Sequence, residues 1–190
     1  MKIKFILLLF ILLSIAIDAT AQRVALKSNL LSAVNGTLNS GVEYALGMHG
    51  TLELSGGLRP WKRTEKYVNR YWLVQQEYRY WICQKFNGSF LGAYVNGGEF
   101  NIGGKKAPFG LFKDLRKRRY SGWLAGVGIC YGYQFMLNTH WNVEAAVGVG
   151  YEYIDYVRYK CPAVCADVIN EGHYHYFGPN KATISIIYIF

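Results

Sequence analysis

Six ionisable side chains recur on the polar side of an alternating pattern, and they are the residues best placed to do chemistry. They are Lys27, Glu43, Glu53, Glu77, Arg79 and Glu144. Neighbouring carboxylates shift each other's pKa and can act as an acid–base or proton-conducting site. In a second interpretation the six form a structural network, with Lys27 and Arg79 neutralising part of the carboxylate charge, because buried charges are tolerated only when they are paired. Which of the two interpretations holds depends on the secondary structure that positions these six side chains.

Two cysteines and two histidines lie close together near the carboxyl end, in the segments CPAVC and EGHYHYFGP. Cys161, Cys165, His173 and His175 could offer sulfur and nitrogen ligands, but C-x₃-C followed by H-x-H is not a standard zinc spacing. An oxidising exterior favours a disulfide between Cys161 and Cys165, and free thiols are a third interpretation. We predict the disulfide, with no metal ion and no cofactor.

The first 21 residues predict export. Lys2 and Lys4 precede an apolar run from Phe5 to Ile17, and Ala19-Thr20-Ala21 supplies a cleavage signal. The run is shorter than the ~20 residues that span a bilayer as a helix. We predict a cleaved signal peptide over residues 1–21 and one domain over residues 22–190.

Strict period-two alternation indicates strands. In WNVEAAVGVGYEY (141–153) the odd positions are apolar or aromatic and the even positions are small or polar. The same arithmetic predicts eight strands, near 24–31, 38–46, 51–58, 72–82, 90–98, 123–135, 141–153 and 181–190. Tight turns join them on one side. Long loops near 60–70, 100–120 and 155–180 join them on the other, as in an up-and-down barrel of an outer membrane.

The two faces of these strands decide between a membrane barrel and a soluble one. The polar face carries the six ionisable residues among many glycines, while the larger face is aliphatic with aromatics near strand ends. These aromatics are Trp61, Trp72, Tyr78, Tyr80, Trp81, Trp123, Tyr133, Trp141, Tyr151 and Tyr153. Lipid-facing bands with aromatic girdles have this pattern, whereas a lipocalin-type barrel encloses its apolar face around a ligand. We predict an all-β fold: an eight-stranded antiparallel up-and-down transmembrane β-barrel of OmpA/OmpX-like architecture. Its interior holds the six ionisable residues as a structural network. Cys83 and Cys130 fall on the same inward parity, and we predict that they are small core residues.

An enzyme is the first alternative function, because lipid-modifying acyl transferases and esterases exist on barrels of this size. They need a nucleophile and a base within hydrogen-bond reach. His173 and His175 are candidate bases in a long loop, but Ser185 falls on the inward face nearer the other end. We therefore predict no catalytic residues. A soluble barrel carrying a small ligand is the second alternative.

Seven basic residues gather between positions 105 and 119. They are Lys105, Lys106, Lys113, Arg116, Lys117, Arg118 and Arg119. An exported protein rarely meets nucleic acid, and no stacking platform lies nearby, so we expect no nucleic-acid partner. Anionic lipid phosphates, as in lipopolysaccharide, would gain on the order of 1 kcal/mol per cation. An acidic protein partner is the second interpretation, and a solvated loop without a partner is the third.

The final strand ends in alternating apolar residues and an aromatic. Ile186, Tyr188 and Phe190 match the carboxy-terminal signal of bacterial outer-membrane proteins, which the barrel assembly machinery reads. This pattern predicts a location in the outer membrane.

At several motifs the chain resembles a family catalogued as domain of unknown function 3575. The motifs are ALKSNLL (25–31), WLVQQEYRYW (72–81), KFNGSF (85–90), GVGICYGY (126–133), WNVEAAVGVGYEYIDY (141–156) and YFGPNKATISIIYIF (176–190). Residues 105–119 carry none of them. The resemblance implies a small outer-membrane barrel of Gram-negative bacteria. Because some relatives lie beside fimbrial genes, it also implies a part in building surface structures. We expect a non-catalytic role in anchoring, adhesion or support of a surface assembly, with a surface or fimbrial protein as partner.

Overall fold

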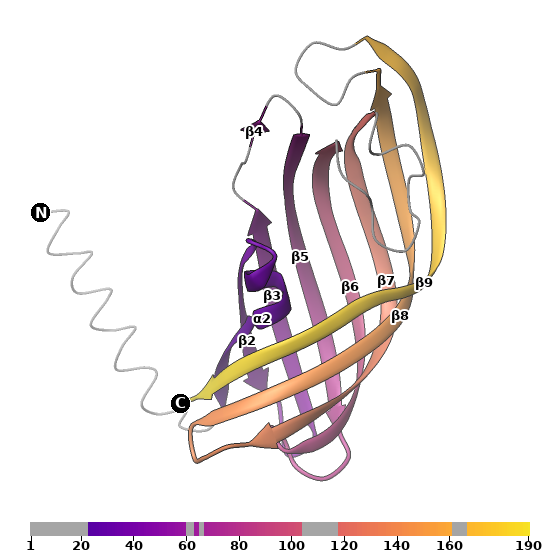
Figure 1. Ribbon diagram of the computed structural model, residues 1–190. Helices are drawn as coiled ribbons and strands as arrows, with labels where there is room; N and C mark the ends of the chain where they lie inside the picture. The colour runs from indigo at the N-terminus through magenta and orange to yellow at the C-terminus, as the bar shows by residue number, and fades with distance from the viewer. Residues whose placement is uncertain (1–22, 60–62, 65–66, 104–117, 161–166) are drawn as a thin grey trace, which may run out of the picture.

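The computed structural model describes residues 23–59, 63–64, 67–103, 118–160 and 167–190 (Figure 1). In chain order the elements are β1 (Val24–Asn29), α2 (Leu30–Val34), β2 (Leu38–Ala45), β3 (Gly50–Arg59), β4 (Arg63–Thr64), β5 (Tyr67–Trp81), β6 (Gly88–Gly103), β7 (Arg119–Met136), β8 (Trp141–Tyr159) and β9 (Val168–Ile189). The fold is all-β, and α2 is the one helix of the described residues. No helix among those residues has the length and apolar character needed to cross a membrane.

Eight antiparallel strands form one ring-like sheet. Neighbours in sequence pair along most of the ring, and two further pairings close it, between β3 and β5 and between β1 and β9. The two-residue β4 only extends the edge of β5. Because every one of the eight strands has two neighbours, the ring leaves no strand with a wholly unpaired edge.

The register of the ring shows that its strands are tilted. Cα partners can be followed from Ile189 of β9 through β1, β2, β3, β5, β6, β7 and β8. They return to β9 at Gly178, eleven residues earlier (189 − 178 = 11). With ~3.3 Å per residue and ~4.8 Å between strands, this offset gives a tilt of about 40° to the ring axis. Each residue then rises ~2.5 Å along the axis.

Alternate side chains of each strand point to opposite sides of the ring. On β8 the side chain of Val147 is 63% exposed, and Trp141 is also exposed, whereas Glu144 is fully buried. The same parity holds around the ring, with aliphatic residues outside and ionisable residues inside. The sidedness expected from the alternation is therefore the sidedness of the fold.

An aromatic cluster fills the interior at the end where the tight turns lie. The Trp81 and Phe90 rings lie 4.9 Å apart, and Phe86 packs against Trp81 from the turn that joins β5 to β6. Phe86 adopts a left-handed φ of 63°, and its carbonyl accepts a hydrogen bond of 3.0 Å from the Asn142 side chain. Burial and this bond hold Phe86 inside the ring, so the turn end is closed by apolar side chains.

Four sequence predictions need correction. The strand expected over 24–31 ends at Asn29, because the Asn29 side chain accepts bonds from the Leu31 and Ser32 amides and begins α2. The loops expected over 100–120 and 155–180 are partly strand, because β6, β7, β8 and β9 continue their pairing to Gly103, Arg119, Tyr159 and Val168.

The other two corrections concern side chains. Trp81, expected in an outer girdle, is buried inside the ring. Cys83, on the inward parity, is an exposed free thiol in a turn, while Cys130 is buried. Trp61 lies outside the described residues.

Candidate functional site

Three carboxylates lie side by side across neighbouring strands. Glu43 of β2 is the register partner of Glu53 of β3, which in turn partners Glu77 of β5. Like charges directly opposite each other destabilise a sheet. The row can persist only if cations reach it from inside the ring.

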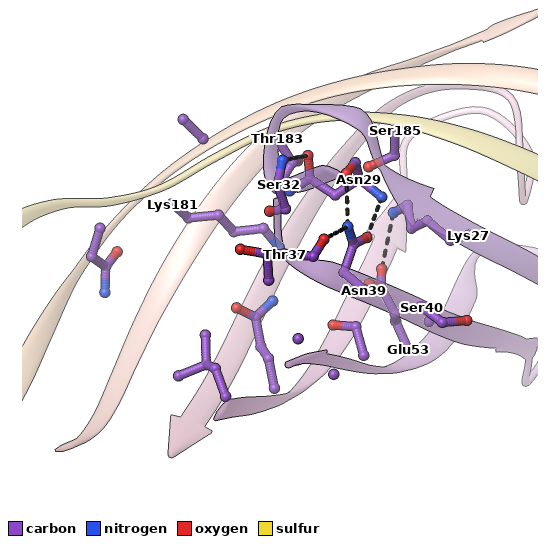
Figure 2. Close-up of a pocket in the computed structure, with 18 of the residues that line it drawn as sticks. Lys27, Asn29, Ser32, Thr37, Asn39, Ser40, Glu53, Lys181, Thr183 and Ser185 are labelled. Carbon is purple, nitrogen blue, oxygen red and sulfur yellow. Dashed lines mark hydrogen bonds and ion pairs between the residues drawn. The ribbon is translucent and has the colours of Figure 1, made fainter. Parts of the chain in front are cut away.

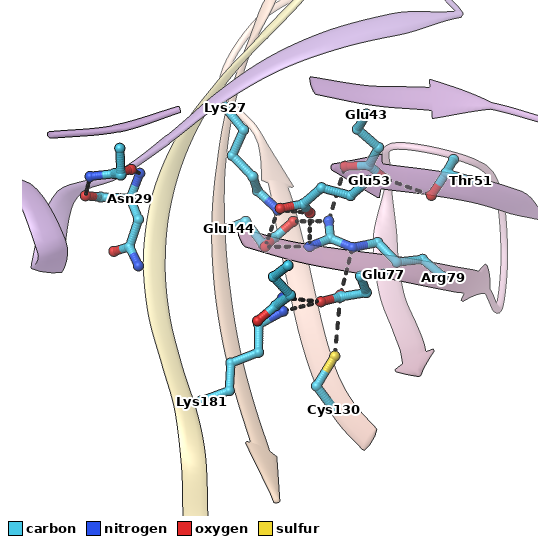
Figure 3. A network of polar contacts seen from close by, with 12 residues as sticks. Lys27, Asn29, Glu43, Thr51, Glu53, Glu77, Arg79, Cys130, Glu144 and Lys181 are labelled. Carbon is cyan, nitrogen blue, oxygen red and sulfur yellow. Dashed lines mark hydrogen bonds and ion pairs between the residues drawn. The ribbon is translucent and has the colours of Figure 1, made fainter. Parts of the chain in front are cut away.

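Arg79 is the centre of the network that compensates these charges (Figure 3). Its Nε lies 2.8 Å from Glu77, and its Nη1 lies 3.0 Å from Glu43 and 2.8 Å from Glu144. Its Nη2 contacts Glu53. The guanidinium is 1% exposed, and its planar fork thus serves four carboxylates at once.

Lys27 joins the network from β1. Its ammonium lies 3.0 Å from Glu53 and 2.6 Å from Glu144, the carboxylate that β8 contributes. The structure thus brings all six predicted ionisable residues into one cluster. Breaking a buried, hydrogen-bonded pair by removing one partner typically costs about 3–5 kcal/mol, so this cluster makes the ring sensitive to substitution.

Lys181 belongs to the same network and was not singled out from the sequence. Its ammonium contacts Glu77. The alternation along the strand could have identified it, because Ala182 and Ile184 point outward and the residue before them, Lys181, must therefore point inward. Thr51, which donates to Glu43 at 2.5 Å, and the Cys130 thiol, 3.3 Å from Glu77, complete the surroundings.

Gly92 makes room for this arrangement. A Cβ atom at position 92 would lie 2.6 Å from the Cys130 sulfur and 2.9 Å from a Glu77 oxygen. Both neighbours are held by the network, so a larger residue would displace them. The glycines on the inward face of the ring therefore have a steric role that the alternation already suggested.

A polar cavity of about 240 Å³ lies against the network (Figure 2). Lys27, Glu53, Arg79 and Lys181 are at its base, and Asn29, Ser32, Thr37, Asn39, Tyr71 and Thr183 are among the residues that line the rest. The Asn39 side chain accepts from the Asn29 amide at 2.5 Å and donates to the Asn29 carbonyl at 2.9 Å. Thr37 and Tyr71 share a hydrogen bond of 2.5 Å. Ordered polar side chains around a cavity can orient a small ligand.

His173 and His175 lie in β9 and not in a loop, on the outer face of the ring. Nδ1 of His175 lies 2.5 Å from the Tyr151 hydroxyl, and His173 stacks on Tyr153. Ser185 is buried inside the ring, so the wall separates it from both histidines. No group of three or more metal-ligating side chains occurs in the described part of the chain.

The remaining predicted site residues fall into two groups. Cys161, Cys165, Lys105, Lys106, Lys113, Arg116 and Lys117 lie outside the described residues. Arg118 precedes β7, and Arg119 is the first residue of that strand, with its guanidinium 4.3 Å from the centre of the Tyr159 ring. At the other end, the Phe190 amide donates to the Val24 carbonyl at 3.1 Å, and Tyr188 packs on Trp141. Ile186 is the register partner of Val143.

Comparison with known protein families shows which family the chain belongs to. The profile of one family, described as "Protein of unknown function (DUF3575)", matches residues 6–190. The protein belongs to the DUF3575 family. The match includes residues 105–119, which contain none of the motifs that carry the family resemblance. No curated protein and no solved structure matches the chain. Because the DUF3575 family carries no assigned activity, the function has to be argued from the geometry.

Proposed function

We propose that this DUF3575 protein is an outer-membrane β-barrel with a non-catalytic, structural or interactive role. In this role it anchors or supports a surface assembly such as fimbriae. The observation that carries the proposal is the outward apolar face of a ring whose ionisable residues are sealed inside.

The outer face suits a lipid environment. Its aliphatic residues include Val42, Leu54, Val74, Val95, Val127, Ile129, Val147 and Val149, all exposed. Exposed aromatics flank them, with Trp72, Trp123 and Tyr151 on the long-loop side and Tyr44, Tyr80, Tyr133 and Trp141 on the turn side. Soluble monomers rarely expose apolar patches larger than a few hundred Å². A lipocalin-type barrel would have the reverse sidedness, which makes that alternative a poor fit.

The interior supports a role other than that of a pore. An eight-stranded ring encloses its own side chains and at most one small ligand, and it leaves no open channel. The apolar cluster of Trp81, Phe86 and Phe90 fills the turn end, and the Arg79 guanidinium lies 4.5 Å from the centre of the Phe90 ring. A protein of this kind acts through its surface and its loops.

The unequal strand lengths favour a role in contacts outside the membrane. The 19 residues of β8 rise ~47 Å at this tilt, whereas the apolar band of an outer-membrane barrel is ~25 Å tall. In Figure 1 the strands β6 to β9 form a tall wall that extends beyond β1 to β3. The part of this wall beyond the band would present a rigid surface to a surface or fimbrial protein.

Export and assembly complete the proposal. The leader over residues 1–21 would direct export, and Ile186, Tyr188 and Phe190 would be read by the barrel assembly machinery. Arg118 and Arg119 at the start of β7, with the basic residues before them, would contact lipopolysaccharide phosphates. Because Ser185 lies inside the ring and His173 and His175 lie outside it, these three residues do not form the nucleophile and base that a lipid-modifying enzyme would need.

Expression of the full chain in a Gram-negative host tests the membrane location. We expect the protein in the outer-membrane fraction, with a gel mobility that changes on heating because the folded ring resists detergent. Recovery as a lipid-free soluble protein would overturn the proposal.

A pull-down of the intact protein from solubilised outer membrane would then identify a surface partner. Lipid phosphate that is retained by wild type but lost from an R118Q/R119Q variant would support the lipopolysaccharide contact.

A further inference from the structure

The wall of the ring is incomplete at the seam between β1 and β9. β1 has six residues and rises ~15 Å at the observed tilt, about three-fifths of a ~25 Å apolar band. It pairs with β9 only from Ala25 to Asn29, opposite Ile189 to Ser185. Within the described residues, the part of β9 from Val168 to Ile184 therefore pairs only with β8. The wall is notched above Asn29.

The helix α2 occupies the base of this notch and is apolar on its outside. It packs beside β9, and none of its residues is buried. Val34 is 88% exposed, and Leu30 and Leu31 are exposed with it. Across the notch, Phe177 of β9 is 80% exposed. Both edges of the notch thus present apolar side chains to the surroundings of the ring.

The polar cavity lies directly behind the notch. Its lining comes from both edges, with Ser32, Thr37 and Asn39 from the α2 side and Ala182 and Thr183 from β9 (Figure 2). The Thr183 hydroxyl is buried and has no hydrogen-bond partner among the described residues. A polar pocket behind an apolar entrance suits an amphiphile, a molecule with one polar part and one apolar part.

The base of the cavity constrains the charge of that molecule. Four carboxylates, Glu43, Glu53, Glu77 and Glu144, share three cations, Lys27, Arg79 and Lys181, which leaves a formal charge of −1. The Arg79 guanidinium is already engaged by all four carboxylates. Lys27 and Lys181, which line the cavity beside Arg79, are likewise paired with carboxylates, so an anionic group would meet no unpaired cation among these lining residues.

From these observations we propose that the cavity binds the head of a single-chain amphiphile. The head is small, rich in hydroxyl groups and without negative charge, and the chain leaves through the notch along Leu31 and Val34 into the bilayer. This inference rests on the proposed membrane insertion. It names a ligand class for a ring that would otherwise serve only as an anchor.

Three probes and two matched variants test it. The protein is placed in phosphatidylcholine nanodiscs and analysed by native mass spectrometry with 1-monopalmitoylglycerol, palmitate or glycerol. Gly57 lines the cavity, and a Cβ there would meet only the Thr37 methyl at 3.5 Å, so Gly57→Phe fills the cavity. Gly97→Phe is the control, because Gly97 lies between outward Val95 and Glu99 and a Cβ there would meet only the Leu124 carbonyl at 3.7 Å.

We expect wild type and Gly97→Phe to retain one monopalmitoylglycerol, and Gly57→Phe to retain about tenfold less. Palmitate should be retained about tenfold less than monopalmitoylglycerol, and glycerol should not be retained. If Gly57→Phe does not fold, Thr183→Val replaces it, and we expect retention reduced about threefold. Equal retention by the cavity variant, or preference for palmitate, would overturn the inference while insertion stands. Failure of wild type to enter nanodiscs would instead overturn the proposed membrane function.

Discussion

The two halves of the ring interior are built differently. In the half nearest the tight turns, apolar rings and a shared ion network fill the space, and Arg79 alone contacts four carboxylates. In the half nearest the long loops, β1 has already ended, α2 replaces strand pairing, and a polar cavity remains. The interior of the turn-side half is filled by its own side chains. The second half has polar surface that can accept another molecule.

Stability should therefore depend mostly on the turn-side half. Arg79→Leu leaves four buried carboxylates with only Lys27 and Lys181. We expect the free energy of unfolding in lipid to fall by about 3–5 kcal/mol. The measurement is a denaturant titration of the heat-modifiable form. Lys160→Leu, at an exposed position beyond β8, is the control and should change little. Unchanged resistance in Arg79→Leu would remove the structural role of the network.

Gly92→Ala tests the packing of the same half. Its new methyl group would displace the Cys130 sulfur and a Glu77 oxygen, and overpacking of this kind costs about 1–3 kcal/mol. The same denaturant titration measures it, with Gly97→Ala as the matched change on the outer face. Equal stability of the two variants would show that the interior is looser than the contacts indicate.

Asn39→Ala tests the long-loop half at the end of β1. The Asn39 side chain takes the place of a strand partner for the Asn29 amide and carbonyl, so we expect a loss of about 1–2 kcal/mol. Hydrogen exchange should rise at Asn29 and in α2 and stay slow at Glu43. Uniform acceleration over the whole ring would contradict the division into two halves.

Tyr151→Phe should have the smallest effect. It removes the exposed hydrogen bond to His175 on the outer face, and we expect a loss of at most about 0.5 kcal/mol. The same titration gives the comparison with Arg79→Leu. A loss as large as that of Arg79→Leu would mean that the outer wall determines stability, and not the interior.

The alternation of side chains predicted much of this architecture. Parity alone placed Glu43, Glu53, Glu77 and Glu144 on one face, and eight antiparallel strands in one ring-like sheet carry them as expected. The DUF3575 resemblance is confirmed by the family match. Lys181 was missed, although its parity is inward, and its partner Glu77 is 104 positions away, so that only the closed ring brings the two together.

Other features were not predictable from local pattern. ALKSNLL alternates less regularly than the later strands, and only the Asn29 cap, held by Asn39 of the next strand, turns the chain into α2. Residues 168–180 include glycine, proline and polar residues typical of a loop, yet cross-strand pairing with β8 makes them strand. Trp81 was misassigned to the outer girdle because it is an aromatic residue near a strand end, although it shares the inward parity of Glu77 and Arg79; its indole donates to Thr51 inside the ring.

The central claim is that the apolar side of each strand faces acyl chains, and spin labels test it most directly. Labels at Val95, Val127 and Val147 of the reconstituted protein should collide readily with oxygen, which concentrates in lipid. They should collide little with a water-soluble nickel chelate, and the label at Lys160 should show the opposite preference. Ready access of the nickel chelate to the three valine positions would contradict the account.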